Sequence, residues 1–281
     1  MALTTDSLLE HSKLAPILRQ LARSFVSLHA EHTRVSTVYA TQQRWLMAHL
    51  AMSIYFRART GDAAGLASAE FLKSAANANI ASRNTAYAFL QEMLKYGYVR
   101  QVPVKDKRFR PMELSEFSVG MVDIWIALHL GTLDAFDAGD RCTRYHADPQ
   151  RVERLQPFIA DAMIAHSPAM SQQPTFSLFT WLNQGGLVMD TMIAGLEEGS
   201  ENPHRIHTSI HSSQEIAERL GISRTHLGRK MKEAEGKGSI GWTGARGRSV
   251  LWVSPEFRRE YHSYQATKLA LIDSCFEATL V

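Results

Sequence analysis

The sequence of 281 residues has only two cysteines, Cys142 and Cys275. Two widely separated cysteines cannot build a disulfide framework or a zinc knuckle. Reduced thiols are typical of the cytosol, so we expect a cytoplasmic protein whose thiols are packed or idle rather than redox sensors. His204, His207 and His211 have the spacing of a metal cluster, but a polar linker explains them better because no cysteine lies nearby. We expect no metal and no cofactor.

Long hydrophobic runs are also absent. The most apolar stretch, residues 119–133, is shorter than the roughly 20 residues that span a bilayer, and Asp123 and His129 interrupt it. The first residues have no basic segment followed by an apolar one, so we expect no signal peptide. We find no Gly-rich phosphate loop, no nucleophile elbow and no defensible pair of catalytic carboxylates. The expectation is a soluble protein with no membrane partner and no enzymatic activity.

The composition is typical of a chain that folds into one large or two ordinary domains. Hydrophobic residues make up 45%, charged residues 21%, and the formal net charge is +3. The charge is unevenly distributed, because residues 139–203 carry 4 basic and 8 acidic side chains while the segments on either side are net basic. We expect an N-terminal domain over 1–138, an acidic helical connector over 139–174 and a C-terminal domain over 175–281.

Apolar residues at helical spacing predict a mainly helical fold with small β-hairpins. Helices are expected over 14–31, 42–59, 68–77, 82–97, 116–136, 149–166, 213–220, 223–235 and 255–276. Apolar helical segments broken by Gly185 and Gly186 are expected over 175–197. Short strands are expected over 98–102, 109–114, 239–243 and 249–254, with a charged turn inside each pair.

The two halves of the chain share an order of elements and a few residues. A shift of 141 positions superimposes Ser82 on Ser223 and Gly97 on Gly238. The serines are plausible N-caps, because their hydroxyls can accept hydrogen bonds from first-turn amides. The recurrence predicts two similar domains in one chain.

Residues 213–235 show the pattern of a helix-turn-helix. A helix, a turn at Gly221 and a second helix follow one another, so that the first helix braces the second and the second presents its start to the major groove. The hairpin that follows has a basic tip, which is typical of a winged helix. In the first half the corresponding turn lacks a glycine and has Asn77-Ala78-Asn79-Ile80 instead, and Asn tolerates the left-handed conformation.

At these residues the first half resembles the MarR-type winged helix-turn-helix repressors. The resemblance covers roughly 14–138 and rests on three elements: Gly97-Tyr98-Val99, Asp106-Lys107-Arg108 and Leu114-Ser115-Glu116. It implies that Arg108 approaches the minor groove and that Asp106 supports the wing. Such proteins dimerise with one winged helix per chain, whereas this chain has two. We therefore expect an internal pseudo-dimer, joined by the helices over 14–31, 116–137, 149–166 and 256–276, with a true homodimer as the alternative.

Charge is concentrated in the two expected reading heads. Residues 80–112 and residues 222–250 each contain seven basic and two acidic side chains, as phosphate neutralisation requires. The residues expected to read bases are Arg83, Asn84, Thr85, Arg224, Thr225 and His226. Ser82 and Ser223 are expected to cap helices or touch phosphate. The residues expected to set affinity are Lys105, Lys107, Arg229, Lys230, Arg246 and Arg248.

The expected function is a sequence-specific regulator of transcription that binds double-stranded DNA. Two alternatives stay open: a plasmid-type replication initiator with two winged-helix domains, and a winged-helix scaffold that binds protein, to which the weaker first head is better suited. The MarR resemblance also implies a small aromatic effector. The side chains that would line its pocket, or simply form core, are Phe176, Phe179, Trp181, Met189 and Met192.

Overall fold

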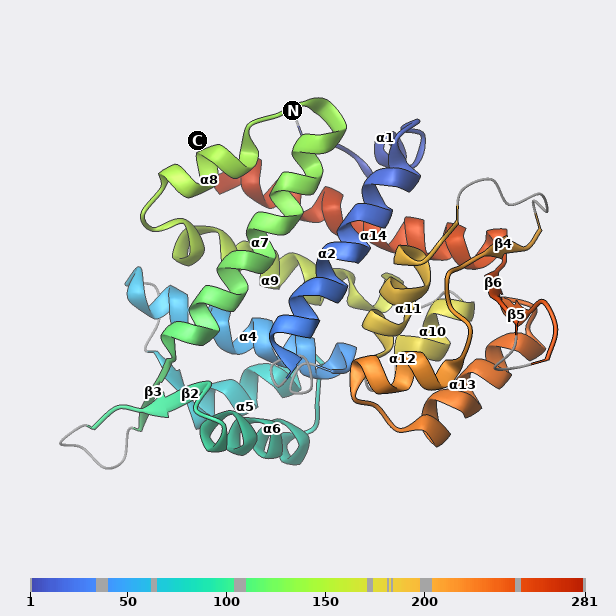
Figure 1. Cartoon of the computed structure of the whole chain (residues 1–281). Helices are drawn as coiled ribbons and strands as arrows, with labels where there is room; N and C mark the ends of the chain where they lie inside the picture. The colour runs from blue at the N-terminus through green and yellow to red at the C-terminus, as the bar shows by residue number, and fades with distance from the viewer. Residues whose placement is uncertain are drawn as a thin grey trace. The chain divides into compact units, whose positions relative to one another are not determined.

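The computed structural model describes residues 2–33, 40–61, 65–103, 110–170, 174–180, 182, 184–197, 204–245 and 249–279 (Figure 1). The elements in chain order are α1 (Thr5–Leu9), α2 (Leu14–Glu31), α4 (Gln42–Arg59), β1 (Leu66–Ala67), α5 (Ser68–Asn77), α6 (Arg83–Lys95), β2 (Val99–Gln101), β3 (Pro111–Leu114), α7 (Glu116–Asp137), α8 (Arg141–Ala147), α9 (Arg151–Met170), α10 (Pro174–Thr180), α11 (Gly185–Ala194), β4 (Ile206–His207), α12 (Ser213–Leu220), α13 (Arg224–Gly236), β5 (Ile240–Trp242), β6 (Leu251–Val253) and α14 (Pro255–Thr279). The prediction of a mainly helical fold with small hairpins is confirmed.

The chain divides into two compact units. Unit 1 comprises Met1–Leu3, Gln43–Ser167 and Leu269–Val281, and unit 2 comprises Thr4–Gln42 and Pro168–Lys268. These bounds differ from the expected segments 1–138, 139–174 and 175–281. The physical reason is that α2 buries its apolar face against α11 within unit 2, while α8 packs on α7 within unit 1.

Each unit contains a three-stranded antiparallel sheet with the same strand order. The order is β1-β3-β2 in unit 1 and β4-β6-β5 in unit 2. The pairing of β1 with β3 and of β4 with β6 was not expected from the sequence, because β1 and β4 have only two residues each. Leu66 pairs with Met112 and Ile206 with Val253, so in each sheet a short segment ahead of the helix pair lies alongside the last strand.

The core of unit 1 contains an unusual group of aromatic rings between α4 and α7. The ring centroids of Trp45 and His49 lie 4.1 Å apart, and those of Trp125 and His129 also lie 4.1 Å apart. The His129 Nδ1 atom lies 2.7 Å from the backbone carbonyl of Trp125. The ring centroids of Trp45 and Trp125 lie 5.7 Å apart, so Trp125 is part of the packing between these helices.

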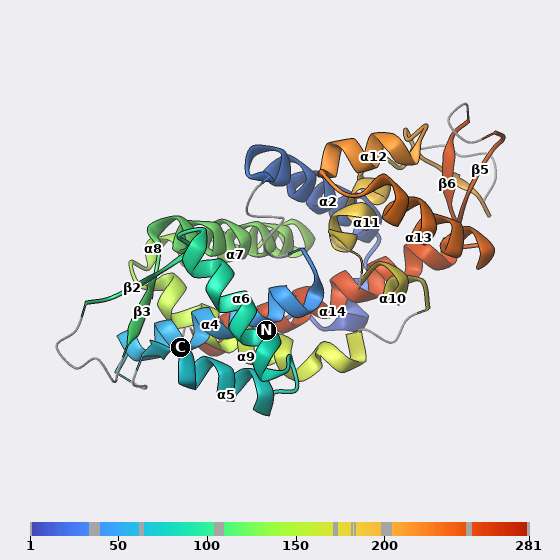
Figure 2. The same ribbon diagram turned by 90° about the horizontal axis from the view of Figure 1, so that it is seen from below.

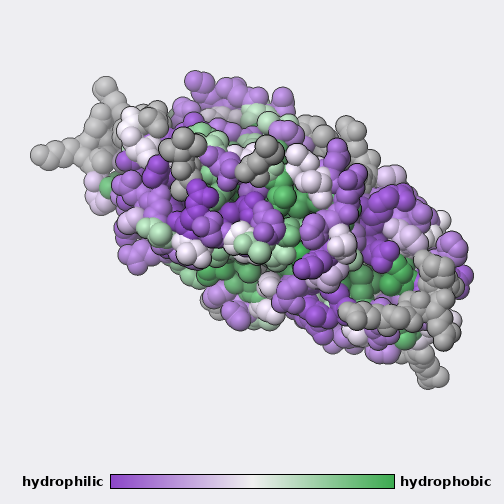
Figure 3. Space-filling view, turned by 90° about the horizontal axis from the view of Figure 1, so that it is seen from above, coloured by the Kyte–Doolittle hydropathy of each residue, from purple (hydrophilic) through white to green (hydrophobic). Residues whose placement is uncertain are grey.

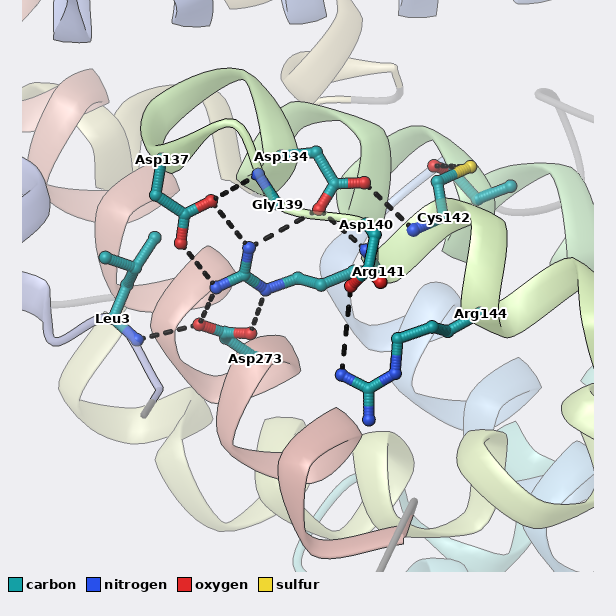
Figure 4. Close-up of polar contacts among 10 residues, drawn as sticks. Leu3, Asp134, Asp137, Gly139, Asp140, Arg141, Cys142, Arg144 and Asp273 are labelled. Carbon is teal, nitrogen blue, oxygen red and sulfur yellow. Dashed lines mark hydrogen bonds and ion pairs between the residues drawn. The ribbon is translucent and has the colours of Figure 1, made fainter.

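A buried arginine joins α7, α8 and α14 within unit 1 (Figure 4). The Arg141 Nε atom donates to Asp273 Oδ1 at 2.6 Å, and both terminal nitrogens donate to the Asp137 carboxylate at 2.8 Å. Asp134 accepts hydrogen bonds from the backbone amides of Arg141 and Cys142, which begin α8. A Cβ atom on Gly139 would lie within 3 Å of this guanidinium and of one oxygen each of Asp134 and Asp137, so a side chain there would displace part of the network.

Unit 2 has its own buried polar group where α11 meets α14. The Tyr261 hydroxyl donates to Asp190 Oδ1 at 2.6 Å, and both side chains are buried. Burial raises the pKa of Asp190 to about 6 and lowers the pKa of Lys268, also on α14, to about 8. The cause is desolvation, which disfavours the charged form of both groups.

The glycines at 185 and 186 do not break a helix but begin one. The backbone of Gln184 is left-handed, with φ at 62°, and α11 starts at the next residue. A Cβ atom on Gly185 would lie 1.6 Å from the Phe179 carbonyl oxygen. Glycine is therefore needed here for close approach of two backbones.

Candidate nucleic-acid interface

The two helices expected to read DNA begin in the same way. In α6 the Ser82 hydroxyl accepts a hydrogen bond from the Thr85 amide at 3.3 Å, and in α13 the Ser223 hydroxyl accepts one from the His226 amide at 3.4 Å. Both serines are N-caps, as the sequence predicted. Each cap satisfies an amide that the helix itself cannot pair.

The turns before these helices also correspond. Gly221 has φ at 63°, and Asn79 has φ at 54°. In both turns the backbone amide of the following isoleucine donates to an alanine carbonyl in the preceding helix at 3.0 Å, from Ile80 to Ala75 and from Ile222 to Ala217. Asn79 therefore takes the left-handed conformation that glycine takes in the second half.

The correspondence continues through the hairpins. Gly97 and Gly238 follow the two helices with φ at 72° and 71°. The next amides close the same turn, since Tyr98 donates to the Met93 carbonyl and Ser239 to the Ala234 carbonyl, each at 3.0 Å. Five elements, a strand, two helices and two strands, thus recur with the same cap, turn and closing hydrogen bonds. The helix pairs α5–α6 and α12–α13, each followed by its hairpin, can be followed in Figure 2.

The start of each helix is accessible. The exposed residues among those expected to contact DNA are Ser82, Arg83, Asn84, Thr85, Ser223, Arg224, Thr225 and Arg229, while His226 and Lys230 are half-buried. The opposite faces are buried, with Leu90 and Met231 at equivalent positions in the two cores. Each helix thus buries one side and exposes its first turn.

Thr85 and His226 are less available than their neighbours. The Thr85 hydroxyl lies 2.9 Å from the Ser82 hydroxyl, within the cap. The His226 backbone amide is used by the Ser223 cap, and its side chain is half-buried. Arg83, Asn84, Arg224 and Thr225 are exposed and their side chains take no part in the caps, so they are the better placed of the expected base-reading residues.

Ion pairs hold several basic side chains at this surface. The Arg224 Nη2 atom donates to Glu218 Oε1 at 2.5 Å, and Lys230 Nζ to Glu233 Oε2 at 3.0 Å. In the hairpin of unit 1 Arg100 pairs with Glu113 on the neighbouring strand at 3.1 Å. Exposed pairs of this kind contribute about 0–1 kcal/mol, so a phosphate group can displace the carboxylate at little cost.

Three exposed residues on these helices were not expected from the sequence to contact DNA. Tyr87 is 51% exposed, and Gln91 lies one turn further along the same face of α6. On α13 the exposed Lys232 stands one turn beyond Arg229. Helical spacing from Asn84 and from Thr225 was the signal that could have found them.

The tips of both hairpins lie outside the described residues. This applies to the expected contacts Lys105, Lys107, Arg108, Arg246 and Arg248 and to the supporting Asp106. Their roles stay predictions from the sequence.

The aromatic and methionine residues expected at an effector pocket are largely core. Phe179, Met189 and Met192 are buried in unit 2, whereas the side chain of Phe176 and all of Trp181 lie outside the described residues.

In the described part of the chain, no group of three or more His, Cys, Asp or Glu side chains is placed to hold a metal ion. The histidines of the polar linker belong to three different places in unit 2: His204 to a turn, His207 to β4, and His211 to the segment before α12.

Burial raises the pKa of the Cys275 thiol to about 11, and the pKa of Cys142 is also raised. Raised pKa values lower the thiolate fraction and favour inert thiols.

The repeated surface therefore consists of two capped helices with exposed polar and basic starts, each followed by a hairpin. Comparison with known proteins finds no matching family model, no matching curated protein and no matching solved structure.

Proposed function

We propose that the protein is a sequence-specific regulator of transcription that binds double-stranded DNA through two winged helix-turn-helix domains in one chain. The observation that supports this most directly is the repeated module of strand, two helices and two strands, whose second helix exposes its capped start both times. A helix held by a bracing helix and exposed at its start is the geometry that reads the major groove.

The chemistry of the exposed side chains supports the same function. Arg83 and Arg224 stand at the first helical position, where a guanidinium can reach the guanine O6 and N7 atoms. Asn84 can form the paired hydrogen bonds that recognise adenine. The first head has fewer exposed cations on its helix than the second, where Arg229 and Lys232 are exposed in addition to Arg224. We infer that the second head supplies more of the affinity.

The test is binding to labelled random-sequence duplex DNA over a salt series. We expect log K to fall linearly with log salt, and expect Arg229→Ala and Lys232→Ala each to reduce the slope by about 0.9 for every phosphate that the variant no longer neutralises. The matched control is Arg154→Ala, which removes an exposed arginine on α9, far along the chain from both heads. Charge reversal at Arg246 and Arg248 should weaken binding to all sequences alike.

Sequence preference needs a second measurement. Selection of bound fragments from a random library should return one preferred site for the wild-type chain, and Asn84→Ala should change that site at one position. If the wild-type chain does not bind duplex DNA even at low salt, the proposal is wrong and a protein-binding role takes its place.

A further inference from the structure

Helix α7 carries an apolar stripe on the side that faces away from the core of unit 1. The stripe consists of Phe117, Met121, Ile124, Leu128, Gly131 and Ala135, which we call the α7 stripe. Each of these residues is exposed or half-buried, and Phe117 and Ile124 are 43% and 42% exposed. Large exposed apolar side chains are otherwise few among the described residues, and hydrophilic residues predominate on the face in Figure 3.

The spacing of the α7 stripe is that of a coiled-coil seam. Successive members are four, three, four, three and four residues apart, which keeps them in line along one side of a helix. Such a row fits a second helix better than an irregular loop, because each side chain can insert between residues of the facing helix. The stripe extends over nearly the whole of α7.

The equivalent helix in the second half shows that the fold does not require this stripe. Ser115 and Ser254 accept the same hydrogen bond at the start of α7 and α14, from the amides of Ser118 and Phe257, which sets an offset of 139 residues. At this offset the buried positions agree: Leu130 corresponds to Leu269, and Leu133 to Ile272. The positions that correspond to the α7 stripe are Glu256, Glu260, Ser263, Thr267, Ala270 and Ser274.

The sizes of the stripe residues suggest which helix covers them. Side chains are large near the start of the stripe, at Phe117 and Met121, and small near its end, at Gly131 and Ala135. An antiparallel pair of identical stripes sets Phe117 against Ala135 and Met121 against Gly131, with Ile124 against Leu128 at the centre. The pairing satisfies two-fold symmetry because each contact occurs twice. We propose that the α7 stripe is a self-association surface that pairs antiparallel with the α7 stripe of a second copy of this chain.

The available area predicts a weak, concentration-dependent dimer. A helix of 22 residues is about 33 Å long and 10–12 Å across. Two such faces bury on the order of 800 Å² in total, just below the roughly 1,000 Å² of a stable interface. The dimer does not depend on the proposed DNA binding and should form without DNA.

Sedimentation equilibrium over the micromolar range tests the proposal. We expect a monomer–dimer equilibrium for the wild-type chain, and at least tenfold weaker association, about 1.4 kcal/mol, for Ile124→Ser with Leu128→Thr. These are the residues that α14 carries at equivalent positions, so the helix should form unchanged. The control is Phe158→Ser, which removes an apolar side chain that is 51% exposed on α9 and outside the stripe.

Disulfide cross-linking tests the direction of the pair. With both native cysteines removed, a mixture of Phe117→Cys and Ala135→Cys chains should form linked dimers, and either variant alone should not. Equal linking of each variant with itself would show a parallel pair and overturn the antiparallel arrangement. A wild-type chain that stays monomeric throughout the range would overturn the proposal. The proposal would also be overturned if the stripe variants bind lipid vesicles less than the wild-type chain does while their self-association is unchanged. If the stripe variants lose much thermal stability while the variants and the wild-type chain have the same monomer mass, the chain itself covers the stripe and the proposal is wrong.

Discussion

Replacing Arg141 with methionine should destabilise unit 1 strongly. Methionine keeps the length of the side chain but removes the guanidinium that donates to Asp273 at 2.6 and 3.2 Å and to both Asp137 oxygens at 2.8 Å. Asp273 is fully buried and, among the described residues, would keep only the hydrogen bond from the Leu3 backbone amide, at 2.7 Å. A buried charge left without its partner costs about 3–5 kcal/mol, so we expect a loss of this size in the free energy of unfolding.

The assay is urea denaturation followed by circular dichroism, with a double-mutant cycle. Asp273→Asn alone should cost less, because Arg141 keeps Asp137, and the double variant should cost less than the sum of the two single losses. Arg144→Met is the control. The ion pair of Arg144 with Asp140, at 3.9 Å, is exposed, so the loss in the free energy of unfolding should stay below about 1 kcal/mol. A loss below about 1 kcal/mol for Arg141→Met would refute the reasoning, because the network would then contribute no more than an exposed ion pair.

Three further predictions concern the turns, the buried carboxylate and the reading face. Gly221→Ala should cost about 1–2 kcal/mol in a thermal melt, because its φ is 63°, whereas Gly221→Asn should cost less since Asn79 takes the same conformation. The pKa of Asp190 is raised to about 6, so the stability that its protonated carboxyl contributes is complete below about pH 4 and is lost as the pH rises through 6. Asp190→Asn should therefore flatten the dependence of the free energy of unfolding on pH over that interval. Gln91→Ala should change site preference in the selection experiment more than Lys232→Ala does, and Lys232→Ala should lower affinity for all duplexes. The opposite result would show that the roles given to these two residues are wrong.

Local signals in the sequence predicted most helices well. Helical spacing and turn residues placed α4 and α5 at the bounds that the structure has, and placed α6 and α13 to within two residues or so at each end. The caps at Ser82 and Ser223 were predictable because a hydroxyl and the amide that it accepts from lie three residues apart. Such interactions depend on neighbours in the chain and need no knowledge of the fold.

Short strands and the membership of the two units were not predictable in the same way. β1 and β4 have two residues each, too few for a period-two pattern, and they exist because distant strands pair with them. The apolar run in α7 was judged too short to cross a membrane, yet in the described chain α7 is the one helix long and apolar enough by length and composition. Its central Asp123 is paired with Arg151 at 2.8 Å, a contact 28 residues away that composition does not reveal.

The sequence by itself determined most of the helices and the two serine caps, because these rest on contacts within a few residues, and the shared order of elements in the two halves. Only the tertiary structure decided that α2 belongs with α11 in unit 2, that Arg141 joins α7 to α14, and that the apolar stripe of α7 is exposed while its equivalent in α14 is polar. Apolar residues occur on both sides of α7, so periodicity alone could not tell which side faces the core. That choice depends on the elements that pack against each side, and they come from distant parts of the chain.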